Sequence, residues 1–500
     1  MVAIPDHGMP RGEILATMRA VRDHDVRWQQ GRAFGLVYHL SEEVDALLKE
    51  AYTMFFSENG LNPTAFPSLR KFETEVVAMT AALLGGDDPS AGSGQSVVGS
   101  ITTGGTESLL MAVKTARDWA RVHRPAVRQP EVVLPLSAHP AFDKAGEYFG
   151  VKMTHVPLRP DFRVDVEAMR AAISPDTIML AASAPSYPHG VVDPIPEIAA
   201  LAQEHDLLCH VDACVGGFML PFVRELGYPV PDFDFRLSGV TSMSADLHKF
   251  GYAAKPASVV LYRTRELRRY QMFVYTDWPG GIYPSPTMTG SRPGGPVAAA
   301  WALMHFLGKE GYRHIAQQVM ETTKYLQGGI NAIPGLQVLS DPEMSVFAIA
   351  ADPLPPPYGP GGGLDVYELA DELALRGWHL DRQHRPPCLH VTINYVHTAV
   401  REDFLRDLVV CAEVVRRPSL RKTVNRLVVD AANAAARLLP ERWMSAVMDK
   451  ASAALGGSGS GLPSRMAPMY GLIGTLPNRG DLKELVLDLL DGLYSVRRGE

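Results

Sequence analysis

The chain has 500 residues, of which 46% are hydrophobic and 21% are charged, so it is long enough to bury a substantial core in two lobes with extensions. Its formal net charge of -7 argues against a surface that mainly binds nucleic acid, and favours small molecules or a second copy of the chain as partners. The four cysteines include no Cys-x-x-Cys pair, so neither a zinc site nor a disulfide framework is predicted, and a reducing cytoplasm fits.

The N-terminus has no apolar core of signal length, and no stretch reaches about eighteen uninterrupted apolar residues. We therefore expect a soluble protein that is neither exported nor membrane-spanning.

Residues 1–65 predict a helical arm, because apolar residues recur at helical spacing from Ile14 to Val21 and from Val44 to Leu48. An arm with so little core of its own has to lie on another surface. A new helix is predicted from Leu69 to about Leu84, and the Gly/Ser/Asp-rich stretch 85–99 reads as a loop.

The segment Ile101 to Ser108, Ile-Thr-Thr-Gly-Gly-Thr-Glu-Ser, predicts a turn that leads into a helix. Its paired glycines, Gly104 and Gly105, let backbone amides approach a ligand, and the hydroxyl of Thr106 adds a hydrogen bond, as in a phosphate site. A plain glycine turn with a Thr or Ser helix cap is at least as common for this motif alone.

Continuous apolar strands then alternate with amphipathic helices, which favours a mainly parallel sheet covered on both faces. The expected strands are 132–136, 152–156, 178–182 and 207–211, and the expected helices follow His139 and span 164–173 and 196–205. In such sheets ligands lie beyond the carboxyl ends of the strands.

Asp212 follows an apolar strand, where a carboxylate costs free energy unless it has a partner. A pyridinium nitrogen is a suitable partner, since the ion pair keeps the ring protonated; the alternative is a cap on the Gly216-Gly217 turn. His139 could stack on such a ring, although a lone histidine is more often structural. Tyr187 or His189 could lie at the same rim.

Lys249 comes just after a strand predicted at 240–244. It is either a solvated loop lysine or a Schiff-base lysine that holds pyridoxal phosphate, which requires a lowered pKa through partial desolvation and nearby positive charge. The directly preceding His248 and the apolar strand 258–262 favour the Schiff-base interpretation.

Five motifs in this order resemble the sphingosine-1-phosphate lyases, which are fold-type I pyridoxal-phosphate enzymes of the group II decarboxylase-like family. They are Gly104–Ser108, His210–Cys214, Ser244–Lys249, Thr276–Trp278 with Gly280–Tyr283, and Gly290–Gly295. The likeness covers about residues 35–500, apart from local additions at 85–99 and 353–363, and fits the bacterial-type soluble form.

The resemblance implies an α/β fold, with a large cofactor-binding domain built on a mostly parallel sheet and a smaller α+β C-terminal domain. The expected parts are the arm 1–65, the large domain 66–310, the small domain 311–430 and a helical extension 431–500. It also implies a homodimer with its active sites at the interface, in the cytoplasm.

The resemblance further assigns roles to residues around pyridoxal 5'-phosphate, and it implies no metal. Lys249 would form the Schiff base, Asp212 would pair with the pyridine nitrogen and His139 would lie against the ring. The cofactor phosphate would be held by Gly105, Thr106 and His248, and by Ser291 from the second subunit.

The substrate phosphate would meet Lys255 and Tyr38, and Tyr187 would line the same pocket as one of the catalytic residues, with Lys249, His139 and Asp212. One position departs from the family: Asn62 stands where a histidine usually contacts this phosphate. Asparagine can donate a hydrogen bond but carries no charge.

The function implied is a lyase of sphingolipid metabolism that splits a phosphorylated long-chain 2-amino-3-hydroxy base, by retro-aldol cleavage between C2 and C3, into an aldehyde and phosphoethanolamine. The residues do not identify the base that takes the C3 hydroxyl proton. The alternatives are an amino-acid decarboxylase on the same scaffold and a catalytically silent scaffold protein.

Overall fold

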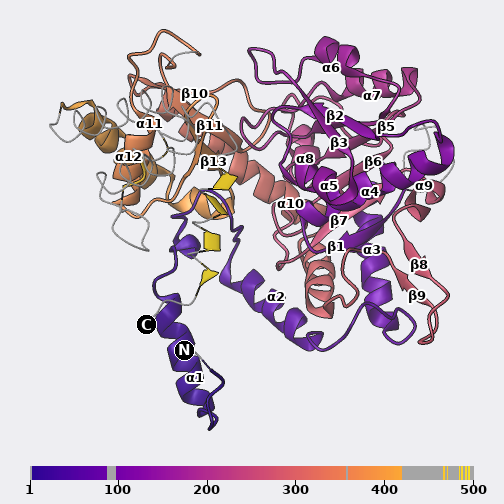
Figure 1. Ribbon diagram of the computed structural model, residues 1–500. Coiled ribbons are helices and arrows are strands. Elements are labelled where there is room, and N and C mark those ends of the chain that lie inside the picture. Colours follow the sequence, from indigo (N-terminus) through magenta and orange to yellow (C-terminus); the bar gives the residue numbers. More distant parts are fainter. Residues whose placement is uncertain are drawn as a thin grey trace.

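The computed structural model describes residues 3–86, 97–355 and 358–418, together with scattered positions of the C-terminal tail between 465 and 495. In Figure 1 the large domain lies on one side of the long helix α10 and the small domain on the other. Among the described residues, no helix has the length and apolar character needed to cross a bilayer.

The large domain is built on a seven-stranded sheet with the strand order β1-β7-β6-β5-β4-β2-β3. Strands β3, β2, β4, β5 and β6 are parallel, whereas β7 runs antiparallel to both β6 and β1. The strands are β1 Val98–Thr102, β2 Glu131–Pro135, β3 Lys152–Val156, β4 Thr177–Ser183, β5 Leu208–Asp212, β6 Ser242–Ala245 and β7 Ser258–Tyr262. The prediction of a mainly parallel sheet is confirmed.

Helices cover both faces of this sheet. Successive side chains of a strand point to opposite sides, so strands that are apolar throughout need a cover on each face. Val133 of β2 belongs to one core cluster, whereas its neighbours Val132 and Leu134 belong to another. The covering helices are α4 Gly105–His123, α5 Ala141–Phe149, α6 Val166–Ala172, α7 Ile195–Glu204, α8 Leu220–Glu225 and α9 Arg265–Arg269.

Within residues 1–65 lie two α-helices, α1 Arg11–Arg22 and α2 Glu42–Met54, and the separate helix predicted from Leu69 to about Leu84 is α3 Pro67–Leu83. Helix α2 packs on α10, whereas α1 has no buried residue and extends away from the body of the molecule (Figure 1). The arm therefore presents a helix that the described part of the chain leaves uncovered.

The prediction of a loop over 85–99 is wrong at its C-terminal end, because Val98 and Gly99 belong to β1. Residues 87–96 lie outside the described residues. Gly99 serves close packing rather than a turn. A Cβ at this position would lie 2.4 Å from the carbonyl oxygen of Val260 in β7, so only glycine allows the two strands to pair here.

The small domain follows α10 Gly294–Asn331, which is kinked at Gly308. Its antiparallel sheet has the order β10-β11-β13-β12, with β10 Leu336–Val338, β11 Val346–Ala351, β12 Asp381–Gln383 and β13 Cys388–Thr392, and its helices are α11 Val366–Ala374 and α12 Arg401–Arg416. The boundary expected after residue 310 lies within α10, and most of the expected extension 431–500 lies outside the described residues.

A two-stranded hairpin, β8 Phe273–Tyr275 and β9 Tyr283–Ser285, projects from the large domain (Figure 1). It exposes several large apolar side chains, namely Phe273, Val274, Tyr275, Trp278 and Ile282. An exposed apolar surface of this kind is typical of a contact with another molecule.

Candidate active site

A cavity of about 660 Å³ opens where β4, β5 and β6 end, between the turn before α4 and residues 35–38 of the arm. The carboxyl ends of parallel strands meet at one edge of a sheet, so this is where ligands are expected. Most of the predicted site residues line it: Tyr38, Gly105, Thr106, His139, Tyr187, Asp212, His248 and Lys249. Lys255, Asn62 and Ser291 are not among the lining residues.

The glycine-rich turn forms one wall of the cavity and leads directly into α4. Gly104 has a φ of 139°, a conformation that favours glycine. The backbone and hydroxyl of Thr103 both donate to Oε2 of Glu107, at 2.6 and 2.7 Å, which fixes the turn. The first backbone N–H groups of α4 therefore lie at the end of the helix that borders the cavity, where the helix dipole favours an anion.

Lys249 lies against a carboxylate that the sequence interpretation did not single out. Its Nζ is 2.8 Å from Oδ2 of Asp246. Burial lowers the pKa of Lys249, but the charge of Asp246 outweighs this effect and leaves the pKa above its ordinary value. The expected lowering of the lysine pKa by positive neighbours is therefore wrong for the chain without cofactor, because the nearest charge is negative.

Asp212 lies at the end of β5, 8% exposed. Its Oδ1 accepts hydrogen bonds from the backbone N–H of Cys214 at 3.0 Å and from Oγ of Ser244 at 3.3 Å. The Cys214 contact is the turn cap considered as an alternative, but the carboxylate also lines the cavity, so the cap does not remove it from reach of a ligand there. Behind it, Oγ of Ser244 lies 3.4 Å from Nε2 of the buried His210.

His139 lines the cavity at the start of α5, where its Nδ1 accepts a hydrogen bond from the backbone N–H of Ala141 at 3.1 Å. This bond fixes the orientation of the imidazole ring. His189, by contrast, stacks on Phe162 with 4.4 Å between ring centroids and is not a lining residue.

Tyr187 connects the large domain with the small domain. Its hydroxyl donates to Oδ2 of Asp381 at 3.1 Å, and its ring stacks on His390 with 3.9 Å between centroids. Burial and the carboxylate of Asp381 both raise the pKa of Tyr187, so the phenol stays protonated. Asp381 and His390 come from β12 and β13, nearly 200 positions later in the chain, and no local pattern identified them.

Tyr38 of the arm lines the same side of the cavity and packs edge-on against Phe250 and Tyr252. Burial raises its pKa to about 12. Lys255 lies just behind this wall, since its Nζ donates to the carbonyl oxygen of Leu36. Burial, and repulsion from Lys249, lower the pKa of Lys255.

Asn62 and Ser291 lie outside the cavity of their own chain. Oδ1 of Asn62 accepts from the backbone N–H groups of Thr64 and Ala65, each at 3.1 Å, so it caps the turn before α3. Oγ of Ser291 accepts a hydrogen bond from Nδ2 of Asn59 at 3.1 Å. These two residues thus belong to neighbouring segments of the surface.

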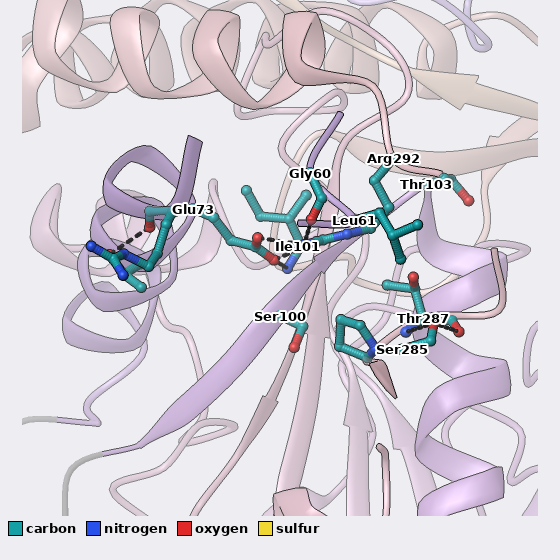
Figure 2. Close-up of polar contacts among 12 residues, drawn as sticks. Gly60, Leu61, Glu73, Ser100, Ile101, Thr103, Ser285, Thr287 and Arg292 are labelled. Carbon is teal, nitrogen blue, oxygen red and sulfur yellow. Dashed lines mark hydrogen bonds and ion pairs between the residues drawn. The ribbon is translucent and has the colours of Figure 1, made fainter. Parts of the chain in front are cut away.

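A salt bridge between Glu73 and Arg292 holds those segments together (Figure 2). Nη1 and Nη2 of Arg292 lie 2.7 and 2.9 Å from the two carboxylate oxygens of Glu73, and Nη2 also donates to the carbonyl oxygen of Gly60 at 2.8 Å. Oε1 of Glu73 accepts from the backbone N–H of Ile101 in β1 at 3.1 Å. The segment before α10, the loop before α3 and the edge of the sheet are thus joined.

Comparisons with known proteins agree with this geometry. Residues 2–350 match the family model described as the pyridoxal-dependent decarboxylase conserved domain. The sphingosine-1-phosphate lyase of Oryza sativa subsp. japonica is 40% identical over 482 residues, which cover 96% of this chain and 79% of that protein.

Among solved structures, the sphingosine-1-phosphate lyase of Burkholderia pseudomallei K96243 superimposes with a TM-score of 0.79 at 40% identity, over 86% of this chain and 96% of that one. A glutamate decarboxylase of Lactobacillus brevis reaches a TM-score of 0.72 at 18% identity, over 84% of this chain and 96% of that one. The second likeness shows a shared fold alone.

Proposed function

Because the chain belongs to the sphingosine-1-phosphate lyase family of pyridoxal-dependent enzymes, we propose that it cleaves a phosphorylated long-chain amino alcohol such as sphingosine 1-phosphate into a fatty aldehyde and phosphoethanolamine. The observation that carries this proposal is the identity with the rice enzyme over nearly the whole chain. Family membership also makes the chain a carbon-carbon lyase with pyridoxal 5'-phosphate as its cofactor.

The cavity residues fit this cofactor. The glycine-rich turn offers backbone amides and the hydroxyl of Thr106 at the N-terminus of α4, a suitable site for a phosphate. Asp212 offers a nearly buried carboxylate to a protonated ring nitrogen, and Lys249 offers a primary amine within the same cavity. A glycine lets the turn lie close to the loop after β5, since a Cβ on Gly105 would lie 2.8 Å from Sγ of Cys214.

When bound, the cofactor supplies an electron sink for the pair of electrons released when the C2–C3 bond breaks. In our proposal Lys249 would hold the cofactor until a substrate amine takes its place, Asp212 would keep the ring nitrogen protonated and His139 would orient the ring. The cofactor phosphate would be held by Gly105, Thr106 and His248, and by Ser291 of a second subunit.

We assign Lys255, Tyr38 and Asn62 to the substrate phosphate, with Tyr187 lining the same pocket. The phenol of Tyr187 already donates to Asp381, so it is suited to holding the substrate in place rather than to removing a proton. The oxygen of Asn62 caps a turn, which leaves its Nδ2 amide as the group that would donate to a phosphate.

We further propose a homodimer with its active sites at the interface. Ser291 and Asn62 lie outside the cavity of their own chain, α1 has no buried residue, and the β8–β9 hairpin exposes apolar side chains. A cytoplasmic location is proposed because all four cysteines are free thiols.

The lyase proposal is tested with purified protein loaded with pyridoxal phosphate. The protein is incubated with sphingosine 1-phosphate, and the aldehyde and phosphoethanolamine are quantified, while a panel of amino acids is assayed in parallel for release of carbon dioxide. Equal amounts of aldehyde and phosphoethanolamine are expected. Carbon dioxide from one amino acid, without aldehyde, would instead identify a decarboxylase on the same scaffold.

The shared site is tested by mixing two inactive variants, Lys249→Ala and Ser291→Asp, after unfolding and refolding them together. Ser291→Asp places a negative charge beside the proposed phosphate site of the partner. Half of the dimers then combine both chains, and one of their two sites is intact, so about a quarter of the wild-type activity returns. If Ser291 serves its own chain, no activity returns.

A further inference from the structure

The side chain of Asp246 lies beneath the glycine-rich turn, at the end of β6, and is 2% exposed. Its Oδ2 forms the ion pair with Lys249, whereas its Oδ1 is buried and makes no hydrogen bond within the described part of the chain. A Cβ on Gly105 would lie 3.0 and 2.9 Å from Oδ1 and Oδ2. Glycine is therefore required for the phosphate-binding turn to rest on this carboxylate.

The carboxylate of Asp246 is kept ionised by its neighbours. Burial raises its pKa, but Lys249 and His248 more than offset this and bring the pKa below its ordinary value. Nε2 of His248 lies 3.8 Å from Oδ2. A buried carboxylate is tolerated only with such a partner, so Asp246 and Lys249 each stabilise the charged form of the other.

The other groups around the amine of Lys249 do not replace Asp246. Cys214, from the loop after β5, and Tyr38, from the arm, have pKa values raised by burial and are neutral at physiological pH. Lys255 is positive and repels a second cation, as the lowering of its pKa by Lys249 indicates. Asp246 is thus the negative group in direct contact with the amine.

We propose that Asp246 is a positioning residue that keeps Nζ of Lys249 protonated and fixed at the cavity floor whenever this amine is free. The amine is free before the cofactor is loaded and, on the proposed function, whenever substrate has displaced it. In both states Asp246 suppresses the nucleophilicity of Lys249, since only the neutral amine attacks a carbonyl. The residue thereby sets the pH above which the chain accepts its cofactor.

The proposal is tested on the cofactor-free chain by brief acetylation with acetic anhydride over a range of pH, followed by mass spectrometry of the lysine peptides. In Asp246→Asn the pH midpoint for labelling of Lys249 is expected to fall by about one unit or more, which corresponds to ~10-fold more neutral amine at a given pH. Lys49 in the same protein, whose side chain is 76% exposed on α2, is the internal control, and its midpoint is expected to stay unchanged.

Two further variants separate the charge of Asp246 from a general effect on the cavity. Asp246→Glu keeps the negative charge and is expected to leave the midpoint near that of wild type. Asp212→Asn removes the other cavity carboxylate, which is bonded to Cys214 and Ser244 instead, and is also expected to leave it unchanged. Equal midpoints in wild type and Asp246→Asn would overturn the proposal, as would equal shifts in Asp246→Asn and Asp246→Glu.

A second readout is the rate at which added pyridoxal phosphate develops visible absorbance. Asp246→Asn is expected to load faster than wild type near neutral pH, and its rate should depend less on pH. Neither measurement requires cleavage of a substrate. A shifted midpoint without lyase activity would support the role of Asp246 and count against the proposed substrate, whereas an unshifted midpoint in an active lyase would do the reverse.

Discussion

Removal of the Arg292 side chain should destabilise the protein far more than removal of an ordinary surface arginine. The salt bridge with Glu73 is bidentate, and the two side chains are only 12% and 19% exposed. In Arg292→Ala the carboxylate of Glu73 loses both of these bonds and keeps the backbone N–H of Ile101, while the carbonyl oxygen of Gly60 also loses its donor. Breaking a fully buried pair costs about 3–5 kcal/mol; allowing for partial exposure, we expect a loss of about 2–4 kcal/mol.

The measurement is the shift of the urea unfolding midpoint, followed by intrinsic fluorescence. Arg159→Ala is the matched control, because Arg159 pairs with Asp161 at 3.1 Å but both side chains are 43% exposed, and such a pair contributes less than about 1 kcal/mol. Glu73→Gln in both backgrounds completes a double-mutant cycle with Arg292→Ala. If Arg292→Ala shifts the midpoint no more than the control does, the salt bridge is not the connection inferred here.

Three further outcomes are expected. Lys249→Ala should show no visible absorbance from lysine-bound cofactor and no turnover, and substantial residual cleavage would contradict the role of Lys249. Tyr187→Phe, which loses the hydrogen bond to Asp381, should raise KM for the phosphorylated substrate about 10-fold with a smaller change in kcat, whereas a loss confined to kcat would contradict a binding role. Stability should fall as the pH drops from 6.5 towards 4, because burial lowers the pKa of four histidines to about 4, namely His189, His210, His390 and His397. The unfolded chain binds these protons first, so each histidine contributes up to about 3 kcal/mol that is present above pH 6.5 and lost as the pH falls. Burial raises the pKa of Asp193 to about 6, so this carboxyl group stabilises the folded chain as the pH falls and opposes the histidines. A urea unfolding midpoint that stays constant from pH 7 to 4.5 would refute the net loss of stability.

The order of strands and helices in the large domain could be predicted because each element has a strong local pattern. The run from Leu207 to Val211 is continuously apolar, and it is buried on both faces as β5. The residues that end such strands meet at one edge for topological reasons, which is why His139 and Asp212 were placed together from the sequence. The resemblance to the lyases rests on the order of the motifs along the chain and gives no distances between their side chains.

Contacts between distant segments could not be predicted in the same way. Asp381 lies on a three-residue strand whose neighbours carry no motif, and only the packing of the small domain brings it to Tyr187. Asp246 lay within a recognised motif, but its contact with Lys249 depends on the local chain path after β6, not on spacing alone. The expected lowering of the lysine pKa was wrong for this reason.

The residues that line the cavity come partly from the rigid sheet of the large domain and partly from peripheral segments. Asp212 ends β5 and Lys249 follows the neighbouring parallel strand β6, so both are placed by the backbone hydrogen bonds between these strands. The residues proposed to meet the substrate come from the arm and from a loop that contacts the small domain, as with Tyr38 and Tyr187. On this proposal, changes in these outer parts would alter the group that is bound without moving the groups proposed to hold the cofactor. The same sheet is therefore compatible with a lyase and with the decarboxylases that share its fold; on the proposed function, the arm, the small domain and the proposed second subunit would decide the substrate.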